Sequence, residues 1–263
     1  TGGAVLGLLI AALVIWLAQS NAVALGADTF KSVVLISLVP AFIAVLSLVI
    51  GAKGVKRGEA VKAPKISFKG LGKPFLVFML IVGIFDLGNS SDAFLVLRAQ
   101  ERGISVLGIL IMLAVFNLVY TLISTPAGAL SDKIGRRKVI IGGWLVYAVI
   151  YLGFALAQKP WHIWVLYVAY GLYYGLAYGT AKAMIADLVT PELRGTAYGT
   201  YNAVLGIIDF PASLIAGLLW QGVGGWSGFG PSAPFLFGSG LAFVAPILMF
   251  FWKPKAVEAV ETA

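Results

Sequence analysis

Long apolar segments recur along this chain and constrain its fold more than any other feature of the sequence. Crossing the hydrocarbon core of a bilayer takes a helix of about 20 mostly apolar residues. The chain is 60% hydrophobic and 11% charged, whereas a soluble domain is about 45–50% apolar. The sequence therefore predicts an all-α polytopic membrane protein with eight transmembrane helices, at residues 2–20, 31–51, 74–97, 106–130, 139–158, 161–186, 195–220 and 232–252.

Lysine and arginine indicate the orientation of these helices. Fifteen of the 19 Lys and Arg residues fall on one side of the predicted membrane and four on the other. Because cytoplasmic loops accumulate such cations, both ends of the chain are predicted to be cytoplasmic. The net charge of +8 then reflects loop composition, and we expect no nucleic-acid partner.

The longest polar segment, residues 52–73, separates two predicted spans from six. It holds seven cations and one acid, Glu59, which is typical of a cytoplasmic basic linker. We expect residues 1–51 to be the last two helices of an N-terminal half, residues 74–252 a complete six-helix C-terminal half, and residues 253–263 a cytoplasmic tail. The unequal numbers of spans predict that the N-terminal half lacks four helices here.

Residues 128–140 read Gly-Ala-Leu-Ser-Asp-Lys-Ile-Gly-Arg-Arg-Lys-Val-Ile. Four cations within six residues cannot lie in hydrocarbon, so we expect a short loop in water on the cytoplasmic side. The spacing of these residues resembles the signature loop of the major facilitator superfamily of transporters. The residues that carry the resemblance are Gly128, Asp132, Gly135, Arg136 and Arg137.

Two further segments are similar to that family. Residues 187–199, which include Glu192 and Arg194, resemble the loop between its tenth and eleventh helices, and residues 85–98 resemble the seventh helix of a prokaryotic branch. The resemblance implies helices five to twelve of a transporter in a prokaryotic cytoplasmic membrane, working by alternating access around a midplane site. The antiporter type often has Gly-Pro where this chain has Gly7-Leu8, which speaks against drug/proton antiport.

The signature motif is a candidate cytoplasmic gate. A carboxylate at Asp132 can interact with the N-terminus of a neighbouring helix, and the family's pseudosymmetry implies the first helix, near residues 1–7. Arg136 and Arg137 can pair with acids, for which Asp187 and Glu192 are the candidates. Such contacts would bias an inward/outward equilibrium. The alternative is that the motif only anchors the topology.

Acidic residues inside the predicted spans mark a candidate pathway. A carboxylate at the centre of a span costs about 2.5–3.5 kcal/mol on insertion scales, so it needs a partner or a wet cavity. Asp86 and Asp209 lie inside spans, and Asp92 lies closer to the outer surface. Helical spacing predicts two polar faces, one with Asp86, Asn89 and Ser90 and one with Asn202, Gly206, Asp209 and Ser213. Asp86 and Asp209 are candidates for a role in transport, and Asp86 for carrying a coupling proton or attracting a cationic substrate group; the alternative is a carboxyl that fixes helix packing.

The sixth predicted span carries two stripes of residues. Gly171, Gly175, Gly179 and Ala183 recur every four residues and predict close approach of another helix. The neighbouring stripe, Tyr170, Tyr174, Tyr178 and Lys182, is a candidate either for cavity lining or for core packing, and Lys182 for binding an anionic group. In the fourth span Asn117 shares a polar face with Thr121 and Ser124, which can line the pathway or bond to neighbouring helices.

These features predict secondary active transport of a small solute across the lipid bilayer by alternating access, with protons as the candidate coupling ion. A transporter-derived membrane scaffold or sensor is the alternative, and a dry, packed centre would favour it. The sequence contains no phosphate-binding loop, metal-ligand cluster or catalytic constellation. We therefore expect no enzyme activity, no catalytic residues, no cofactor and no metal site.

Overall fold

The computed structural model describes residues 2–19, 25–51 and 68–254, and these are almost entirely helical. Their one β-type contact is an isolated bridge between Val223 and Trp226. A 3-10 helix, η1 (Pro191–Leu193), precedes α8. The predicted all-α fold is confirmed, with the α-helices α1 (Gly2–Gln19), α2 (Ala27–Gly51), α3 (Gly72–Leu87), α4 (Ala93–Glu101), α5 (Val106–Ile134), α6 (Arg136–Leu156), α7 (Pro160–Leu188), α8 (Arg194–Gln221) and α9 (Ala233–Phe251).

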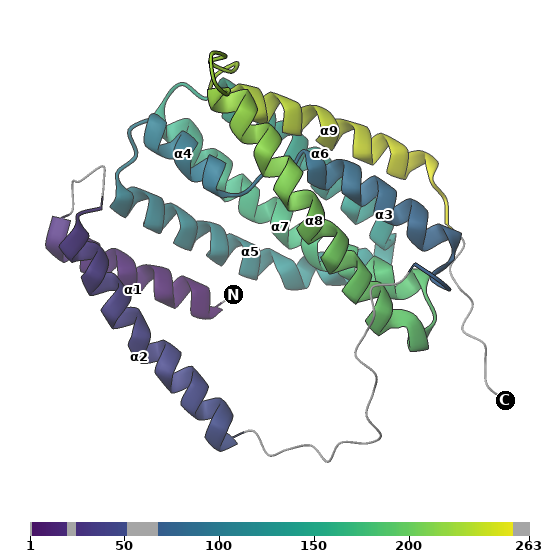
Figure 1. Cartoon of the computed structure of the whole chain (residues 1–263). Coiled ribbons are helices and arrows are strands. Elements are labelled where there is room, and N and C mark those ends of the chain that lie inside the picture. The colour runs from purple at the N-terminus through teal and green to yellow at the C-terminus, as the bar shows by residue number, and fades with distance from the viewer. Residues whose placement is uncertain (1, 20–24, 52–67, 255–263) are drawn as a thin grey trace.

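Helices α3 to α9 form one bundle (Figure 1). Helix α6 packs against α7 and α9, α5 packs against α7, and α3 packs against α8 and α9. Helix α1 lies along α5, and α2 makes its main contacts with α1, at the edge of the molecule (Figure 1). Thr29 is the one buried residue of α2, so this apolar helix presents nearly all of its surface to its surroundings.

Six of the described helices are long and apolar enough to cross a membrane: α1, α2, α5, α6, η1 with α8, and α9. Helix α7 covers the predicted span 161–186 but is rich in tyrosine, which lowers its hydropathy. The predicted span 74–97 is divided between α3 and α4. The count of eight spans therefore stays a prediction for these two regions.

The prediction of one continuous helix over residues 74–97 is wrong. Helix α3 ends at Leu87, residues 88–92 are not helical, and α4 begins at Ala93. The break falls on Gly-Asn-Ser-Ser-Asp, residue types that favour turns and caps over helix interiors. Gly88 also packs closely on α9, because a Cβ there would lie 3.0 Å from the carbonyl oxygen of Gly238. Composition and packing together explain the break.

Neighbouring helices satisfy polar groups that the break exposes. The hydroxyl of Tyr147 on α6 donates to Asn89 Oδ1 at 3.0 Å and to the carbonyl oxygen of Gly88 at 3.4 Å. The backbone N–H of Ser91 donates to Ser213 Oγ on α8 at 3.3 Å. Non-helical backbone at membrane depth is tolerated where protein groups or a wet cavity satisfy it in this way.

The predicted loop within residues 128–140 is much shorter than expected. Helix α5 continues to Ile134, α6 begins at Arg136, and Gly135 alone joins them. Gly135 has φ of +95°, a backbone conformation that side chains other than glycine rarely adopt. The 29 residues of α5 span about 43 Å, which exceeds the roughly 30 Å of hydrocarbon. The cations can therefore sit on helix ends that project into water.

Most of the predicted linker (residues 52–67), residues 255–263 of the predicted tail, and Thr1 lie outside the described residues. Of the remaining linker positions, Gly72 and Lys73 already belong to α3. The predicted division into domains stays a prediction.

Candidate functional site

A polar cavity of about 560 Å³ lies where the helix is broken between α3 and α4. The break supplies one wall, Tyr174 of α7 a second and α8 a third. The cavity brings together the predicted residues Asn89, Asp92, Tyr174 and Asp209. Its full lining is Asn89, Ser90, Ser91, Asp92, Tyr174, Gly206, Asp209, Phe210 and Ser213.

Helix α8 presents its predicted polar face to this cavity. Gly206, Asp209 and Ser213 line it, and Ser213 also accepts the hydrogen bond from the backbone of the break. Asn202, on the same face, is exposed and is not part of the cavity lining.

Asp92 is held at the cavity wall by a tyrosine. The hydroxyl of Tyr170, a fully buried residue of α7, donates to Asp92 Oδ1 at 2.7 Å. A hydrogen bond to a charged group is short and strong, so this contact fixes the carboxylate at the start of α4. Tyr170 is thus a core residue that orients a cavity residue.

A second, smaller cavity of about 80 Å³ adjoins the first and contains Asp86. Asn89 and Tyr174 line both cavities. Asp86 is only 7% exposed, and its Oδ2 has no hydrogen-bond partner among the residues that the structure describes. The prediction that Asp86, Asn89 and Ser90 share one helical face is wrong, because the helix ends at Leu87. Asn89 still lies beside Asp86 in the smaller cavity, whereas Ser90 lines the larger one.

At the predicted cytoplasmic side, Arg136 pairs with Asp187, as the sequence suggested. Arg136 Nε lies 3.0 Å from Asp187 Oδ2, which joins the start of α6 to the end of α7. A longer contact of 3.9 Å joins Arg136 to Asp132. A cavity of about 310 Å³, which Gly128 also lines, lies beside Asp132 and Arg136, between α5, α6 and α7.

Other predicted contacts of the motif differ in the structure. Arg137 donates to the backbone carbonyl of Phe250 on α9 at 2.9 Å instead of pairing with an acid. This carbonyl lies in the last turn of α9, where cationic donors are favourable. Glu192 and Arg194 are exposed. The contact expected between Asp132 and the first helix stays a prediction. A Cβ at Gly2, Gly3 or Gly7 would meet no atom within 4 Å, so these positions of α1 show no close neighbour.

Lys182 contacts its own helix rather than a partner anion. Its Nζ donates to Tyr178 Oη at 3.1 Å and lies 4.2 Å from the centre of the Tyr178 ring. Asn117 likewise donates to the Leu113 carbonyl on its own helix at 2.9 Å, and Thr121 and Ser124 bond one turn back in the same way. All three hydrogen bonds stay within α5. Ser124 also lines the cavity of about 310 Å³ beside Arg136, and a place for Asn117 and Thr121 on the solute pathway stays a prediction.

The glycine stripe of α7 serves close packing, as predicted, over part of its length. A Cβ at Gly175 would lie 2.6 Å from Ile123 Cγ2 of α5, and one at Gly171 would lie 2.8 Å from the Phe116 carbonyl oxygen. Gly179 instead meets no such neighbour and lines the cavity beside Arg136.

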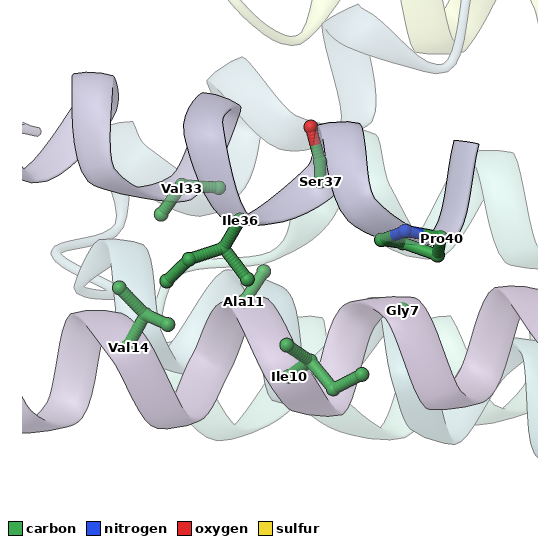
Figure 2. Close-up of a pocket in the computed structure, with 8 residues that line it drawn as sticks. All are labelled: Gly7, Ile10, Ala11, Val14, Val33, Ile36, Ser37 and Pro40. Atoms are coloured by element: carbon green, nitrogen blue, oxygen red, sulfur yellow. The ribbon is translucent and has the colours of Figure 1, made fainter. Parts of the chain in front are cut away.

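A further pocket of about 110 Å³ lies between α1 and α2 (Figure 2). Its walls are apolar side chains such as Ile10, Val14 and Ile36. The one hydroxyl, that of Ser37, points away from α1 in Figure 2 and donates to the Val34 carbonyl. This pocket offers no polar group to a solute, unlike the two cavities in the bundle.

Sequence reasoning missed the aromatic side chains that surround Asp86. Trp144, Tyr173 and Tyr201 line the smaller cavity, from α6, α7 and α8. The density of tyrosine in α7 was a signal, but no pattern in the sequence relates these helices to one another. Arg98, one of the four cations on the opposite side of the predicted membrane, was also missed as a structural residue, because its side chain is fully buried.

Comparison with known proteins gives the family. Residues 76–263 match the model of the Major Facilitator Superfamily. An uncharacterised MFS-type transporter of Methanocaldococcus jannaschii is 36% identical over 261 residues, which cover 95% of this chain and 61% of that protein. Multidrug resistance protein 2 of Bacillus subtilis is 30% identical over 202 residues, 74% of this chain and 43% of that protein.

A third relative is the class B tetracycline resistance protein of Escherichia coli, 27% identical over 143 residues, which cover 54% of this chain and 33% of that protein. The chain thus spans less than two thirds of the length of each of these relatives. The family match covers most of the chain, and it agrees with the apolar helices and with the signature motif. This chain is an integral membrane protein that belongs to the Major Facilitator Superfamily.

Proposed function

We propose that this chain is part of a secondary active transporter that moves a small organic solute across the membrane by alternating access. The observation that carries the proposal is the polar cavity of about 560 Å³ at the broken helix between α3 and α4. Substrate and coupling-ion sites of many secondary transporters lie at such discontinuous helices near the membrane midplane. Four preceding helices of the same protein would complete the wall of this cavity.

The proposed coupling ion is the proton, carried by Asp86 or Asp209. Carboxylates within membrane spans are costly and commonly mark proton relays or substrate sites. Asp209 lines the open cavity, and Asp86 lies in the enclosed one that shares Asn89 and Tyr174 with it. A proton can therefore reach either carboxylate from the solute cavity.

The proposed cytoplasmic gate is the ion pair between Arg136 and Asp187. It joins α6 to α7 beside the cytoplasmic cavity. A contact that exists in one conformation only shifts the equilibrium toward that conformation. The orientation with cytoplasmic termini follows from the distribution of Lys and Arg and belongs to the same proposal.

The alternative, a scaffold or sensor that transports nothing, predicted a dry and fully packed centre. An open cavity with two carboxylates and several hydroxyls argues for transport instead. Membership of a transporter family likewise argues against an enzyme. Two relatives carry drug-resistance names. We therefore include organic molecules of drug size among the proposed solutes.

Solute flux in vesicles tests this proposal. The protein, extended by its upstream coding sequence, is placed in proteoliposomes, and accumulation of tetracycline and of a fluorescent organic cation is measured with and without a pH gradient. We expect accumulation that depends on the gradient and is lost in Asp86→Asn or Asp209→Asn. Asp28→Asn, at an exposed surface position, serves as the control. Flux that is equal with and without the gradient, and in both variants, would contradict proton coupling.

A further inference from the structure

The smaller cavity has an unusual combination of walls. Aromatic side chains from four helices and one buried carboxylate surround a space of about 80 Å³. Drug-sized ligands occupy pockets of roughly 300–1,000 Å³. A compact head group therefore fits this cavity, whereas the body of a larger solute does not. The aromatic lining consists of Phe85, Trp144, Tyr173, Tyr174, Tyr178 and Tyr201.

Asp86 provides an unsatisfied acceptor in this cavity. It is 7% exposed, and its Oδ2 has no hydrogen-bond partner in the described part of the chain. A buried polar group without a partner is costly, so each one in a native protein calls for an explanation, such as a bound water, ion or ligand. A donor or cation that enters the cavity would satisfy this oxygen.

The aromatic rings are arranged as a connected wall. Phe85 stacks on Trp144 with ring centres 4.7 Å apart, and Phe85 lies 5.9 Å from Tyr173. On the other side, Tyr174 stacks on Tyr178 at 5.8 Å. Ring faces attract cations, and aromatic cages recognise alkylammonium groups in this way.

The rim of the cavity already holds an ammonium group of the protein itself. Lys182 Nζ lies 4.2 Å from the centre of the Tyr178 ring. This contact is a cation–π interaction at the edge of the lining, within one helical turn of the cavity. It indicates that the aromatic rim accommodates ammonium, and it places a competing positive charge beside one ring of the lining.

We propose that the smaller cavity is an aromatic cage for the ammonium head group of an organic cation, with Asp86 as its counter-ion. The remainder of the solute would extend past Asn89 and Tyr174 into the polar cavity. The inference rests on the proposed transport function only for its physiological role, because binding in the cage can be measured without transport. It names the substrate class as alkylammonium compounds.

Binding of choline to the purified full chain in detergent, measured by calorimetry, tests the cage. The uncharged carbon analogue of choline, which has the same shape, is the matched ligand control. We expect choline to bind and its neutral analogue to bind at least tenfold more weakly, because only the cation gains from Asp86 and the rings. Equal affinity for the two ligands, or no binding of choline, would overturn the proposal.

Substitutions in the cage separate charge from ring contributions. Asp86→Asn keeps the side-chain shape and is expected to weaken choline binding at least tenfold. Tyr178→Leu removes a ring at the rim and is expected to weaken binding by roughly threefold, the lower range for an exposed cation–π contact, whereas Tyr178→Phe keeps the ring and should weaken it less. Lys182→Met removes the competing ammonium and should tighten binding. Since Tyr178 is 47% exposed, its variants are tolerated by the fold even if Asp86→Asn is not.

The outcomes distinguish this inference from the proposed function. Choline binding that requires Asp86, without solute flux in vesicles, would support the cage and contradict transport. Solute flux without choline binding would support transport and overturn the cage. If both Asp86→Asn and Tyr178→Leu bound choline as tightly as the unchanged protein does, the cage would be overturned, whatever the solute flux in vesicles.

Discussion

At the scale of single residues, Arg98 holds one end of the bundle together. Its Nε donates to the Phe154 carbonyl at 3.0 Å, and its Nη2 donates to the carbonyl oxygens of Ala155 and Ala157 at 3.0 and 3.2 Å. Nη2 also lies 3.2 Å from Ser232 Oγ, just before α9. One side chain thus joins α4 to the C-terminal end of α6 and to the start of α9. By fixing α4, it also fixes the far side of the helix break that lines the cavity.

Replacing Arg98 should strongly destabilise the protein. Arg98→Ala removes a donor from the carbonyl groups of Phe154 and Ala157, whereas the Ala155 carbonyl still accepts from Ser232 Oγ, and we expect a loss on the order of 3 kcal/mol in the free energy of unfolding. Arg98→Lys should lose less stability than Arg98→Ala but should remain less stable than the unchanged protein, because a lysine cannot reproduce the planar fork of donors. Thermal unfolding in detergent measures both. Lys31→Ala, which removes an exposed ion pair with Asp28, is the control, and an equal loss in that variant would refute the role of Arg98.

At the scale of elements, Gly135 determines how α5 turns into α6. A single residue makes this connection, with φ of +95°. The tight turn brings Arg136 and Arg137 to the first turn of α6, where Arg136 reaches Asp187 and Arg137 reaches the Phe250 carbonyl. The glycine of the signature motif therefore positions its arginines.

Gly135→Ala is expected to destabilise the protein by about 1–3 kcal/mol, because alanine would be held in a sparsely populated backbone conformation. Gly142→Ala is the matched control. Gly142 lies within α6 with open space around it, so alanine there should be neutral or stabilising by up to about 1 kcal/mol. Thermal unfolding of the two variants compares them directly. A similar change in both would show that the turn does not require glycine.

The ion pair between α6 and α7 should control access to the cavity of about 310 Å³ that lies beside it. The chain contains no cysteine, so a Ser124→Cys variant carries a unique label in the lining of that cavity. We expect Arg136→Gln to raise its labelling rate by about fivefold, which corresponds to roughly 1 kcal/mol for a partly exposed pair. Asp187→Asn should do the same, and the double variant should add little, since both changes remove one interaction.

Lys138→Gln tests whether charge alone changes the labelling. Lys138 is exposed on the same helix, and its replacement should leave the rate unchanged. If the effects of Arg136→Gln and Asp187→Asn were additive in free energy, the two residues would not act through a common contact.

At the scale of the whole molecule, the orientation in the membrane can be tested with the same cysteine-free background. Lys133→Cys lies beside the turn between α5 and α6, and Ser227→Cys lies in the exposed connection between α8 and α9. In intact cells, an impermeant maleimide should label Ser227→Cys alone, and Lys133→Cys should react only after permeabilisation, because the cation-rich side is predicted to face the cytoplasm. The reverse pattern would show that the predicted orientation is inverted.

Much of the helical architecture was predictable because hydrophobic length is a local property of the sequence. The bounds of α1, α6, α8 and α9 differ from the predicted spans by a few residues. The breaks were harder to predict. A helix stops at Leu87 partly because Gly88 packs against α9. Helix α5 continues through a charged segment to Ile134, and its length of about 43 Å exceeds the roughly 30 Å of hydrocarbon.

The candidate site was predictable only in part for the same reason. Asp86 and Asp209 could be recognised as candidates from the sequence, because a carboxylate inside an apolar span is costly and needs a partner or a wet cavity. The side chains that surround the acidic residues come from other helices: Tyr170 bonds to Asp92 across 78 positions of the chain, and Trp144 lines the same cavity as Asp86. Such contacts depend on how helices pack, and helical periodicity describes one helix at a time.

The sequence by itself determined that this chain is a helical membrane protein and which motif relates it to a family, whereas the side of the membrane that its cations occupy stays a prediction. These properties follow from the cost of placing polar groups in hydrocarbon, which acts residue by residue along the chain. The tertiary structure alone decided where a helix breaks, which arginine is buried, and which aromatic rings enclose Asp86. Those outcomes depend on close packing between helices distant in the sequence, where a glycine, a hydroxyl or a guanidinium meets a partner that local composition does not specify.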